Sequence, residues 1–335
     1  MKGKQGMVCM GLLLVLSSCH TGKQITASGL QRKDFQTEVN GQHTDLFTLS
    51  NKQGMEVCIT NYGARVVSIL VPDRNGKRED VVCGFSTITE YMEQRQNFGS
   101  TVGRYIGRIL NARFTLDGVE YKLVPNNGKS GHISHGGNPG FADRMWKVEQ
   151  ADTHRVRLSY LSPDGENGFP GNLKVTLVYS LGEDDNALDL TYEATTDAPT
   201  VLNLSHHSFF NISGNFTKSV EDQQLWVDAD RFTPYDDKKC VTGEYLQVAG
   251  TPLDFRMPHA IGECIDADHP QLKVVNGYDH TWELNTKGDD TRPAAWVYDP
   301  VSGRKMEIFT TEPGMQIYTG NGLKGKMTGK GGMAY

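Results

Sequence analysis

Residues 113–124 carry the sequence RFTLDGVEYKLV, in which apolar and polar side chains alternate on both sides of an Asp-Gly pair. Phe114 and Leu116 alternate with polar residues before the pair, and Val119 and Tyr121 alternate with them after it. A period of two is typical of a strand with one buried face, and Asp-Gly favours the tight turn of a hairpin. This stretch therefore predicts an antiparallel β-hairpin.

Similar runs recur along the chain, separated by clusters of Pro, Asp, Asn and Gly that indicate turns. They are residues 65–71, 155–161, 173–181, 187–195, 296–298, 305–310 and 315–319. Only residues 87–96 have the character of a short helix, and no segment shows a sustained helical stripe or a βαβ alternation. The sequence therefore predicts an all-β fold, with one large antiparallel β-sandwich domain over residues 33–335.

The composition is that of an ordinary globular protein. The chain has 335 residues, 37% of them hydrophobic and 22% charged, so it is long enough to bury a large core. Acidic residues outnumber basic ones by 40 to 34, and no block rich in Lys and Arg occurs. No nucleic-acid partner is expected, because phosphate binding requires an excess of positive charge. The lack of GxGxxG and GxxxxGK[ST] motifs also argues against nucleotide cofactors.

The beginning of the chain has the pattern of an export signal. Two lysines precede an apolar run, residues 8–16, which is too short to span a bilayer. The run ends in Leu-Ser-Ser-Cys, which resembles the lipobox of bacterial lipoproteins, so Cys19 is the expected lipidation site. Residues 1–18 are then a signal peptide and 19–32 a polar tether to the domain. This pattern predicts an exported protein that is lipid-anchored to a bacterial membrane and faces the periplasm. A plain secretory signal and a short buried helix are the alternatives.

Four further cysteines follow the lipobox: Cys58, Cys83, Cys240 and Cys264. An even number permits disulfides in an oxidising compartment, but no CxxC or Cys/His zinc spacing occurs. Cys58 and Cys83 lie in apolar, strand-like runs. We therefore expect buried free thiols.

Histidines form two local groups that could carry chemistry. His132 and His135 lie in HISHGG, and His206 and His207 lie in NLSHHSFFN. Imidazole gives and takes a proton near neutral pH, and convergent polar groups in an otherwise apolar strand indicate a binding site. Residues at odd separations on a strand point to opposite faces, so zinc would need one histidine from each group and an outside ligand. We therefore favour proton transfer and predict no metal ligands, although a lone histidine more often has only a structural role.

These histidines belong to a series of motifs that resembles the aldose 1-epimerases (galactose mutarotases), from about Phe35 to the end of the chain. In order, the motifs are TNYGAR (60–65), VPDRNG (71–76), GRYIGRI (103–109), HGG (135–137), GFPG (168–171), NLSHHSFFN (203–211), GTPLDFR (250–256) and QIYTGN (316–321). Each motif is weak alone, whereas their common order is specific. The resemblance implies a large β-sandwich whose concave face binds a pyranose sugar.

The resemblance also implies roles for individual residues. His207 matches the acid that protonates the ring oxygen, and His135 matches a partner that positions and polarises the sugar. Arg108, Asp254 and Gln316 fall where the family places hydrogen bonds to the substrate. In the family a glutamate takes the proton from the anomeric hydroxyl, the ring opens, the C1–C2 bond turns, and closure gives the other anomer. This chemistry needs no cofactor. The resemblance is compatible with a structural calcium ion, and it implies a monomer.

The chain departs from the family pattern at three positions near these residues. Gly107 stands where the family usually has Asn before the arginine, and His206 stands where it commonly has Asn before the catalytic histidine. Phe209 replaces a Tyr and therefore lacks the phenolic hydroxyl. We expect these changes to shift substrate preference without abolishing the reaction.

The end of the chain departs further. In the family, the catalytic glutamate lies in strands that follow the segment matched by residues 322–326, and no residue up to Tyr335 matches it. Glu312 is the acidic residue nearest to Gln316, but the family's base does not lie there, so we do not transfer the role. The sequence is therefore expected to be truncated, without its C-terminal strands.

Taken together, the sequence predicts an aldose 1-epimerase that interconverts the α and β anomers of hexopyranoses such as glucose and galactose. Two alternatives remain open. A non-catalytic carbohydrate-binding protein could use the same pocket without the base. A glycoside hydrolase needs two acidic residues on either side of the glycosidic bond, for which no signature is present.

Overall fold

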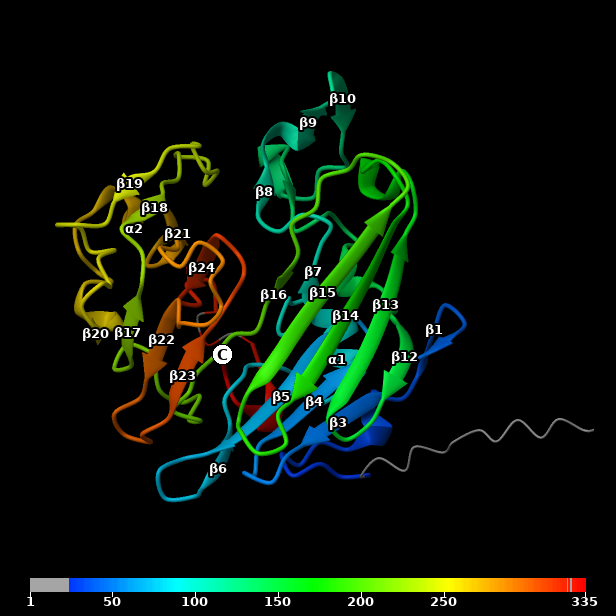
Figure 1. The fold of residues 1–335 in the computed structure, drawn as a ribbon, viewed down its shortest axis with the longest axis vertical. Helices are drawn as coiled ribbons and strands as arrows, with labels where there is room; N and C mark the ends of the chain where they lie inside the picture. The colour runs from blue at the N-terminus through cyan, green and yellow to red at the C-terminus, as the bar shows by residue number, and fades with distance from the viewer. Residues whose placement is uncertain (1–23, 324, 326) are drawn as a thin grey trace, which may run out of the picture.

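The computed structural model describes residues 24–323, 325 and 327–335. The predicted signal segment, 1–18, and the predicted lipidation site, Cys19, lie outside these residues. The described chain is built mainly of antiparallel strands, which confirms the predicted all-β sandwich class. Figure 1 shows two lobes of strands lying next to each other. Within the described part of the chain, no helix is long and apolar enough to cross a membrane.

The first lobe packs two four-stranded antiparallel sheets face to face around one core. One sheet contains β3 (Leu46–Ser50), β4 (Glu56–Thr60), β5 (Arg65–Pro72) and β6 (Arg78–Asp80), and the other contains β12 (Lys147–Ala151), β13 (Arg155–Ser162), β14 (Leu173–Leu181) and β15 (Leu188–Thr196). The strand β14 has the bounds that the sequence predicted. Its alternate residues Leu173, Val175 and Leu177 are buried between the sheets, as a period of two requires.

The second lobe repeats this arrangement with shorter strands around a second core. Its sheets are β20 (His259–Ala260), β17 (Gln224–Val227), β22 (Ala295–Tyr298) and β23 (Lys305–Ile308), and β19 (Leu246–Gln247), β18 (Arg231–Thr233), β21 (Asp279–Glu283) and β24 (Gly314–Tyr318). The sequence predicted one pair of sheets, and the structure has two pairs. A chain of this length exceeds what one core serves well, so each lobe has its own core, and smaller clusters around Phe85 and around Phe169 supplement them.

Short pairs of strands connect and extend the large sheets. They are β1 (Glu38–Val39) with β2 (Gln42–His43), β7 (Thr101–Val102) with β16 (Ser205–His206), β8 (Arg108–Ile109) with β11 (Ile133–Ser134), and β9 (Arg113–Leu116) with β10 (Val119–Lys122). The helices are α1 (Ile88–Gln94), α2 (Pro270–Val275) and the 3₁₀ turns Arg32–Phe35, Leu110–Ala112, Gly128–Ser130, Phe141–Asp143, Glu166–Gly168, Ile261–Glu263 and Lys330–Gly332. Thr87 and Glu90 form a capping box at the start of α1, within the stretch predicted as helical.

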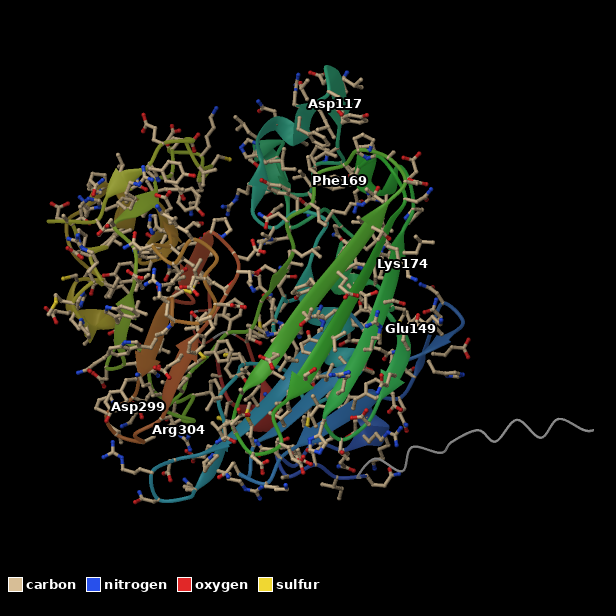
Figure 2. All side chains as sticks on the ribbon, viewed as in Figure 1. Asp117, Glu149, Phe169, Lys174, Asp299 and Arg304 are labelled. Carbon is tan, nitrogen blue, oxygen red and sulfur yellow. The ribbon has the colours of Figure 1, made fainter. Side chains whose placement is uncertain are left out.

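The predicted hairpin is present as β9 and β10, with Leu116 paired to Val119 across the turn. Asp117 and Gly118 have φ angles of 51° and 80°. A two-residue turn with positive φ at both positions matches the twist of antiparallel strands, and Asp-Gly is suited to it. Asp117 lies at the tip of this hairpin in Figure 2.

Arg304 joins the two lobes near the turn between β22 and β23 (Figure 2). Its guanidinium donates to the carbonyl of Ser213 at 2.8 Å and to the carbonyl of Lys77, in the turn before β6, at 3.0 Å. From the other side, Arg74 donates to the carbonyl of Pro300 at 2.7 Å. These reciprocal contacts hold the turns of the two lobes together.

The described part of the predicted tether, residues 24–32, packs against the first lobe. Leu30 is buried in a core cluster, and the backbone N–H groups of Ala27 and Ser28 donate to the buried carboxylate of Glu56. The sequence placed the start of the domain at residue 33, whereas packed structure already includes these residues. Polar composition concealed this, because the segment is held largely by hydrogen bonds within itself and to the distant carboxylates of Glu56 and Asp45.

The four described cysteines are free thiols. Cys58, Cys83 and Cys240 are buried, and Cys264 is half-buried. Burial raises the pKa of both Cys58 and Cys83 to about 12. These two thiols therefore stay protonated at neutral pH and are unreactive.

Candidate active site

The short strand β16 sets the direction of His207. Ser205 and His206 pair with β7, and the next residue, His207, continues this pairing through both of its backbone groups. Its N–H donates to the carbonyl of Ser100 at 2.9 Å, and its carbonyl accepts from the N–H of Gly99 at 3.0 Å. Adjacent residues of an extended chain point to opposite sides, so His206 and His207 diverge. Figure 1 shows β16 running between the two lobes.

His135 meets His207 although 72 positions separate them in the sequence, 207 minus 135. The two ring centroids lie 5.4 Å apart, with the planes nearly perpendicular at 86°. The following residue, Gly136, approaches the backbone of Gly103 so closely that a Cβ atom would lie 1.8 Å from its carbonyl oxygen. Glycine is therefore required after His135 to bring the histidine into this position.

The ring of His135 is held in one tautomer. Its Nδ1 accepts a hydrogen bond from the backbone N–H of Gly107 at 3.2 Å, so the neutral ring carries its proton on Nε2. Burial, followed by the nearby His207 and Arg108, lowers the pKa of His135 to about 3. His135 is consequently neutral at physiological pH and can donate a hydrogen bond from Nε2.

His207 lies against an aromatic floor. Phe209 stacks on it with a centroid distance of 5.3 Å and an angle of 29°, and Tyr318 meets Phe209 edge-on at 5.6 Å. Burial is the main cause that lowers the pKa of His207 below its ordinary value. A lowered pKa makes the protonated imidazole a stronger acid, which suits transfer of a proton to an ether oxygen.

His206 faces away from this pair. Its Nε2 lies 2.6 Å from the hydroxyl of Ser208. Its ring meets that of Tyr179 of β14 edge-on, with 6.2 Å between the ring centroids. Burial lowers the pKa of His206 to about 3, so this ring also stays neutral. His206, the unusual histidine of this motif, therefore packs against Tyr179 and Ser208 and does not face His135.

The second lobe contributes a polar cluster at the edge of β24. Gln316 pairs with Thr281 of β21, and the Thr281 hydroxyl donates to the Gln316 side-chain carbonyl. The Gln316 amide nitrogen donates to Oδ1 of Asp279 at 2.7 Å and to the hydroxyl of Tyr235 at 3.2 Å. Burial raises the pKa of Asp279, which Gln316 and Arg108 partly offset.

Arg108 connects this cluster to the histidines. It pairs with Ser134, the residue before His135, and its guanidinium donates to the carbonyl of Lys239 in the second lobe at 3.0 Å. Its positive charge acts on His135 and on Asp279 alike, lowering the pKa of each. Tyr318, the last residue of β24, pairs with Asp279 in the sheet, and its ring also contacts Phe209, which stacks on His207. These contacts connect one set of residues around a single site, and we call this set the circuit: Arg108, His135, His207, Phe209, Tyr235, Asp279, Gln316 and Tyr318.

The model of the aldose 1-epimerase family matches residues 45–335 of this sequence. The chain belongs to the aldose 1-epimerase family. We therefore take the circuit around His135 and His207 as the candidate active site.

Individual members of the family are similar over most of their length. A galactose mutarotase from Bos taurus is 40% identical over 290 residues, which cover 86% of this chain and 81% of that protein. An aldose 1-epimerase from Escherichia coli K12 is 36% identical over 286 residues, covering 85% and 81% of the two chains. The crystal structure of a galactose 1-epimerase from Lactobacillus acidophilus has a TM-score of 0.77 at 30% identity, over 87% of this chain and 83% of that one.

Of the residues expected from the aldose 1-epimerase resemblance, Asp254 lies outside the circuit. Both of its carboxylate oxygens accept from the guanidinium of Arg256, at 2.9 and 2.8 Å. The residue before it, Leu253, accepts from the indole of Trp282, which points into the core from the face of β21 opposite to Asp279. The structure therefore brings Arg108, Gln316, His135 and His207 together but places Asp254 elsewhere.

The carboxylate that lies beside Gln316 is that of Asp279 and not that of Asp254, and Tyr235 places a hydroxyl there that the sequence did not reveal. Asp279 opens a strand directly after the turn Asn276-Gly277, and its side chain alternates with the buried His280 and Trp282. That alternation predicts that the Asp279 carboxylate faces outward. It does not predict which side chain of β24 lies beside the carboxylate.

Glu312 lies away from this circuit. It is exposed in the turn before β24, beyond the Gly314 end of the strand, whereas Asp279 pairs with Tyr318 at the opposite end. Gly314 and Tyr318 are four residues apart in β24 and therefore separated by roughly 13 Å, so Glu312 lies beyond the far end of the strand from Asp279. The structure thus agrees with leaving the role of the base untransferred.

The surroundings of the histidines can be searched for metal ligands only among the described residues. Across residues 24–323, 325 and 327–335, no group of three or more His, Cys, Asp or Glu side chains could hold an ion. His132, the other histidine of its group, is buried and accepts at Nδ1 from the N–H of Asn111 at 3.0 Å. The pair of His135 and His207 therefore has no third ligand among the described residues.

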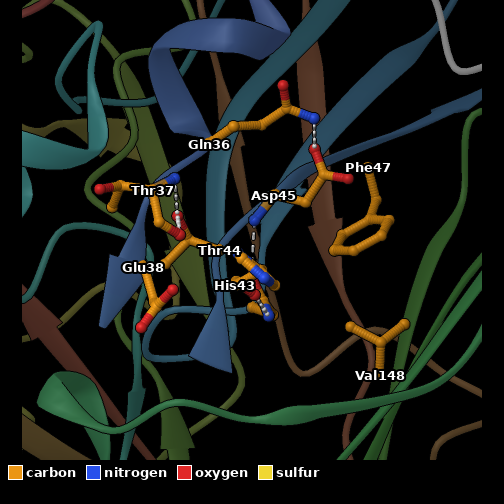
Figure 3. A pocket seen from close by; sticks show the side chains of 9 residues that line it. Gln36, Thr37, Glu38, His43, Thr44, Asp45, Phe47 and Val148 are labelled. Carbon is orange, nitrogen blue, oxygen red and sulfur yellow. Dashed lines mark hydrogen bonds between the residues drawn. The ribbon is translucent and has the colours of Figure 1, made fainter. Parts of the chain in front are cut away.

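A hollow of about 500 Å³ lies on another part of this aldose 1-epimerase family member (Figure 3). Its lining consists of Gln36, Thr37, Glu38, His43, Thr44, Asp45, Phe47, Asn61 and Val148. The Asp45 carboxylate is already occupied there by Arg32 and Gln36. None of the lining residues belongs to the circuit of His135 and His207, so we do not place the sugar in this hollow.

Proposed function

We propose that this chain interconverts the α and β anomers of an aldohexose such as glucose or galactose. The observation that carries the proposal is the circuit in which Arg108 on one side, and Phe209 with Tyr318 on the other, connect the paired histidines His135 and His207 to Gln316 and Asp279 of the second lobe. Relatives named galactose mutarotase and aldose 1-epimerase, at 36–40% identity, support the same activity.

The proposed reaction is an exchange of protons at two oxygens of the sugar. A hemiacetal ring opens when the ring oxygen gains a proton while the anomeric hydroxyl loses one. Protonated His207 gives the first proton, and water takes the second from the anomeric hydroxyl. The neutral His135 donates a hydrogen bond from Nε2 that polarises the sugar, and both protons return when the ring re-forms. The C1–C2 bond then turns, and the hydroxyl that re-forms the ring attacks the other face of the aldehyde. No redox change or group transfer occurs, so the reaction needs no cofactor.

The polar cluster is proposed to hold the sugar hydroxyls. Oδ1 of Asp279 accepts from Gln316, which leaves Oδ2 for a sugar hydroxyl, and Arg108 supplies cationic donors beside it. Among the described residues we assign the role of the family's glutamate to none. Asp279 is assigned to binding because its carboxylate is already part of the hydrogen-bonded cluster.

Exchange spectroscopy by NMR tests this function at equilibrium. Saturating the anomeric proton of α-D-glucose is expected to reduce the β signal in proportion to the amount of protein added. Binding of glucose without exchange would instead support a carbohydrate-binding protein. Release of reducing sugar from an aryl glycoside would support a hydrolase.

Asp279→Asn is expected to weaken hexose binding about 10- to 100-fold, because a charged acceptor is lost from a hydrogen bond to the sugar. Asp254→Asn is the matched control, since Asp254 is a half-buried aspartate paired with Arg256, and it should leave the affinity unchanged. Titration calorimetry with galactose measures both. Loss of affinity in Asp254→Asn with none in Asp279→Asn would return the role to Asp254.

We also propose that the protein is exported and anchored by lipid at Cys19, with its domain in the periplasm. The support is the order of basic residues, short apolar run and Leu-Ser-Ser-Cys at the start of the sequence. A Cys19→Ser variant is expected to move the protein from the membrane fraction to the soluble fraction. A wild-type protein found wholly in the soluble fraction would contradict the anchor.

A further inference from the structure

Tyr235 lies on the second-lobe side of the site and is held in place by its backbone. Gln271 of α2 reaches it with both ends of its amide: Oε1 accepts from the Tyr235 N–H at 2.8 Å, and Nε2 donates to the Tyr235 carbonyl at 3.0 Å. Tyr235 also forms an antiparallel bridge with Val241, which closes the loop behind it. Because the backbone is fixed at both groups, the half-buried side chain has a defined direction.

The hydrogen bonds around Gln316 leave that amide almost fully used. One N–H goes to Asp279, the other goes to Tyr235, and its carbonyl accepts from Thr281. An amide side chain has two N–H donors and one carbonyl oxygen with two lone pairs. Gln316 can therefore offer an incoming sugar only one acceptor position.

The phenol of Tyr235, in contrast to the Gln316 amide, still has its hydrogen-bond donor unused. Its oxygen accepts from Gln316 at 3.2 Å and also faces the guanidinium of Arg108, which likewise only donates. Neither the Gln316 nitrogen nor the Arg108 guanidinium, the groups that face the phenol, can accept its hydrogen, so that hydrogen is available to a third group. Asp279, which shares Gln316 as a partner, has Oδ2 available as an acceptor.

We propose that Tyr235 is a substrate-binding residue that determines specificity: its O–H donates to a sugar hydroxyl whose own hydrogen is accepted by Asp279. A hydroxyl both donates and accepts, so a phenol beside a carboxylate matches it at both ends. The inference rests on the proposed function and adds to it a requirement for one particular hydroxyl of the sugar. A sugar lacking that hydroxyl leaves both protein groups unpaired, which such sites reject strongly.

The test compares Tyr235→Phe with the wild-type protein by calorimetry, using galactose, glucose and their 2-, 3-, 4- and 6-deoxy analogues. Tyr235→Phe is expected to weaken binding of the parent sugars about 3- to 10-fold. One deoxy analogue should bind the two proteins equally, because it lacks the hydroxyl that Tyr235 contacts. KM for mutarotation should rise by the same factor while kcat is kept.

Tyr245→Phe is the control, because Tyr245 is exposed and its ring lies under Arg231 instead of at the site. Unchanged affinities in Tyr235→Phe would overturn the inference. An equal loss for every deoxy analogue would also overturn it, because such a loss indicates a purely structural role. A wild-type protein that binds no hexose would instead overturn the proposed function, and the inference with it.

Discussion

A His207→Ala variant is expected to exchange sugar anomers about 10²- to 10⁴-fold more slowly than the wild-type protein, because it lacks the group proposed to protonate the ring oxygen. The side chain lies on Phe209 and beside His135, so its removal leaves the remaining polar cluster of the second lobe in place. NMR exchange at equal protein concentrations measures the rate, and calorimetry with galactose measures binding separately. Binding should persist while exchange is lost.

His43→Ala is the matched control for this variant. His43 is an exposed histidine in the hollow of Figure 3, remote from the circuit of the proposed active site, so its loss should leave exchange unchanged. Thermal unfolding of both variants shows whether the fold is retained. A well-folded His207→Ala protein with wild-type exchange would exclude His207 as the acid.

Arg104→Ala is expected to lower the free energy of unfolding by about 3–5 kcal/mol. The Arg104 side chain is buried, and its guanidinium supports several loops at once. It donates to the hydroxyl and carbonyl of Ser162 at 2.8 and 3.0 Å and to the carbonyls of Pro163, Pro170 and Gly171 at 2.9, 2.7 and 2.9 Å. Alanine would leave the acceptors of the buried Ser162 and Gly171 without this donor, which costs more than the lost contacts themselves.

Urea unfolding measures this loss, with Arg113→Ala as the control. Arg113 is an exposed arginine whose ion pair with Glu120 spans 3.9 Å, and such surface pairs contribute at most about 1 kcal/mol. A small effect of Arg104→Ala, comparable to that of the control, would show that water or a rearranged loop satisfies the carbonyls. In that case the segment from Arg104 to Arg108 is held by its backbone contacts to Asn203.

Long strands could be predicted from the sequence, and short ones could not. The pattern over residues 173–181 gave the bounds of β14, and Asp117-Gly118 gave the turn of the hairpin, because each signal is local. The pairs β7 with β16 and β8 with β11 have two residues in each strand. Strands so short have no period, and their formation depends on partners far away in the sequence.

The same distinction applies to the candidate site. Motifs around His135 and His207 pointed to two histidines, but their meeting depends on backbone pairing to residues 99–100 and to Gly107. Asp279 was missed because its partner Gln316 comes from a neighbouring strand, whereas Asp254 was chosen because the aldose 1-epimerase resemblance implied a substrate contact in its motif. The sequence does not show that the Asp254 carboxylate is already paired with Arg256.

Polarimetry of freshly dissolved α-D-glucose and α-D-galactose, with purified residues 20–335, tests the central claim most directly. The rotation approaches its equilibrium value with a first-order rate constant. The account predicts that this constant rises linearly with protein concentration and falls back toward the buffer value in the His207→Ala protein. A folded wild-type protein that leaves both sugars at the buffer rate would contradict it.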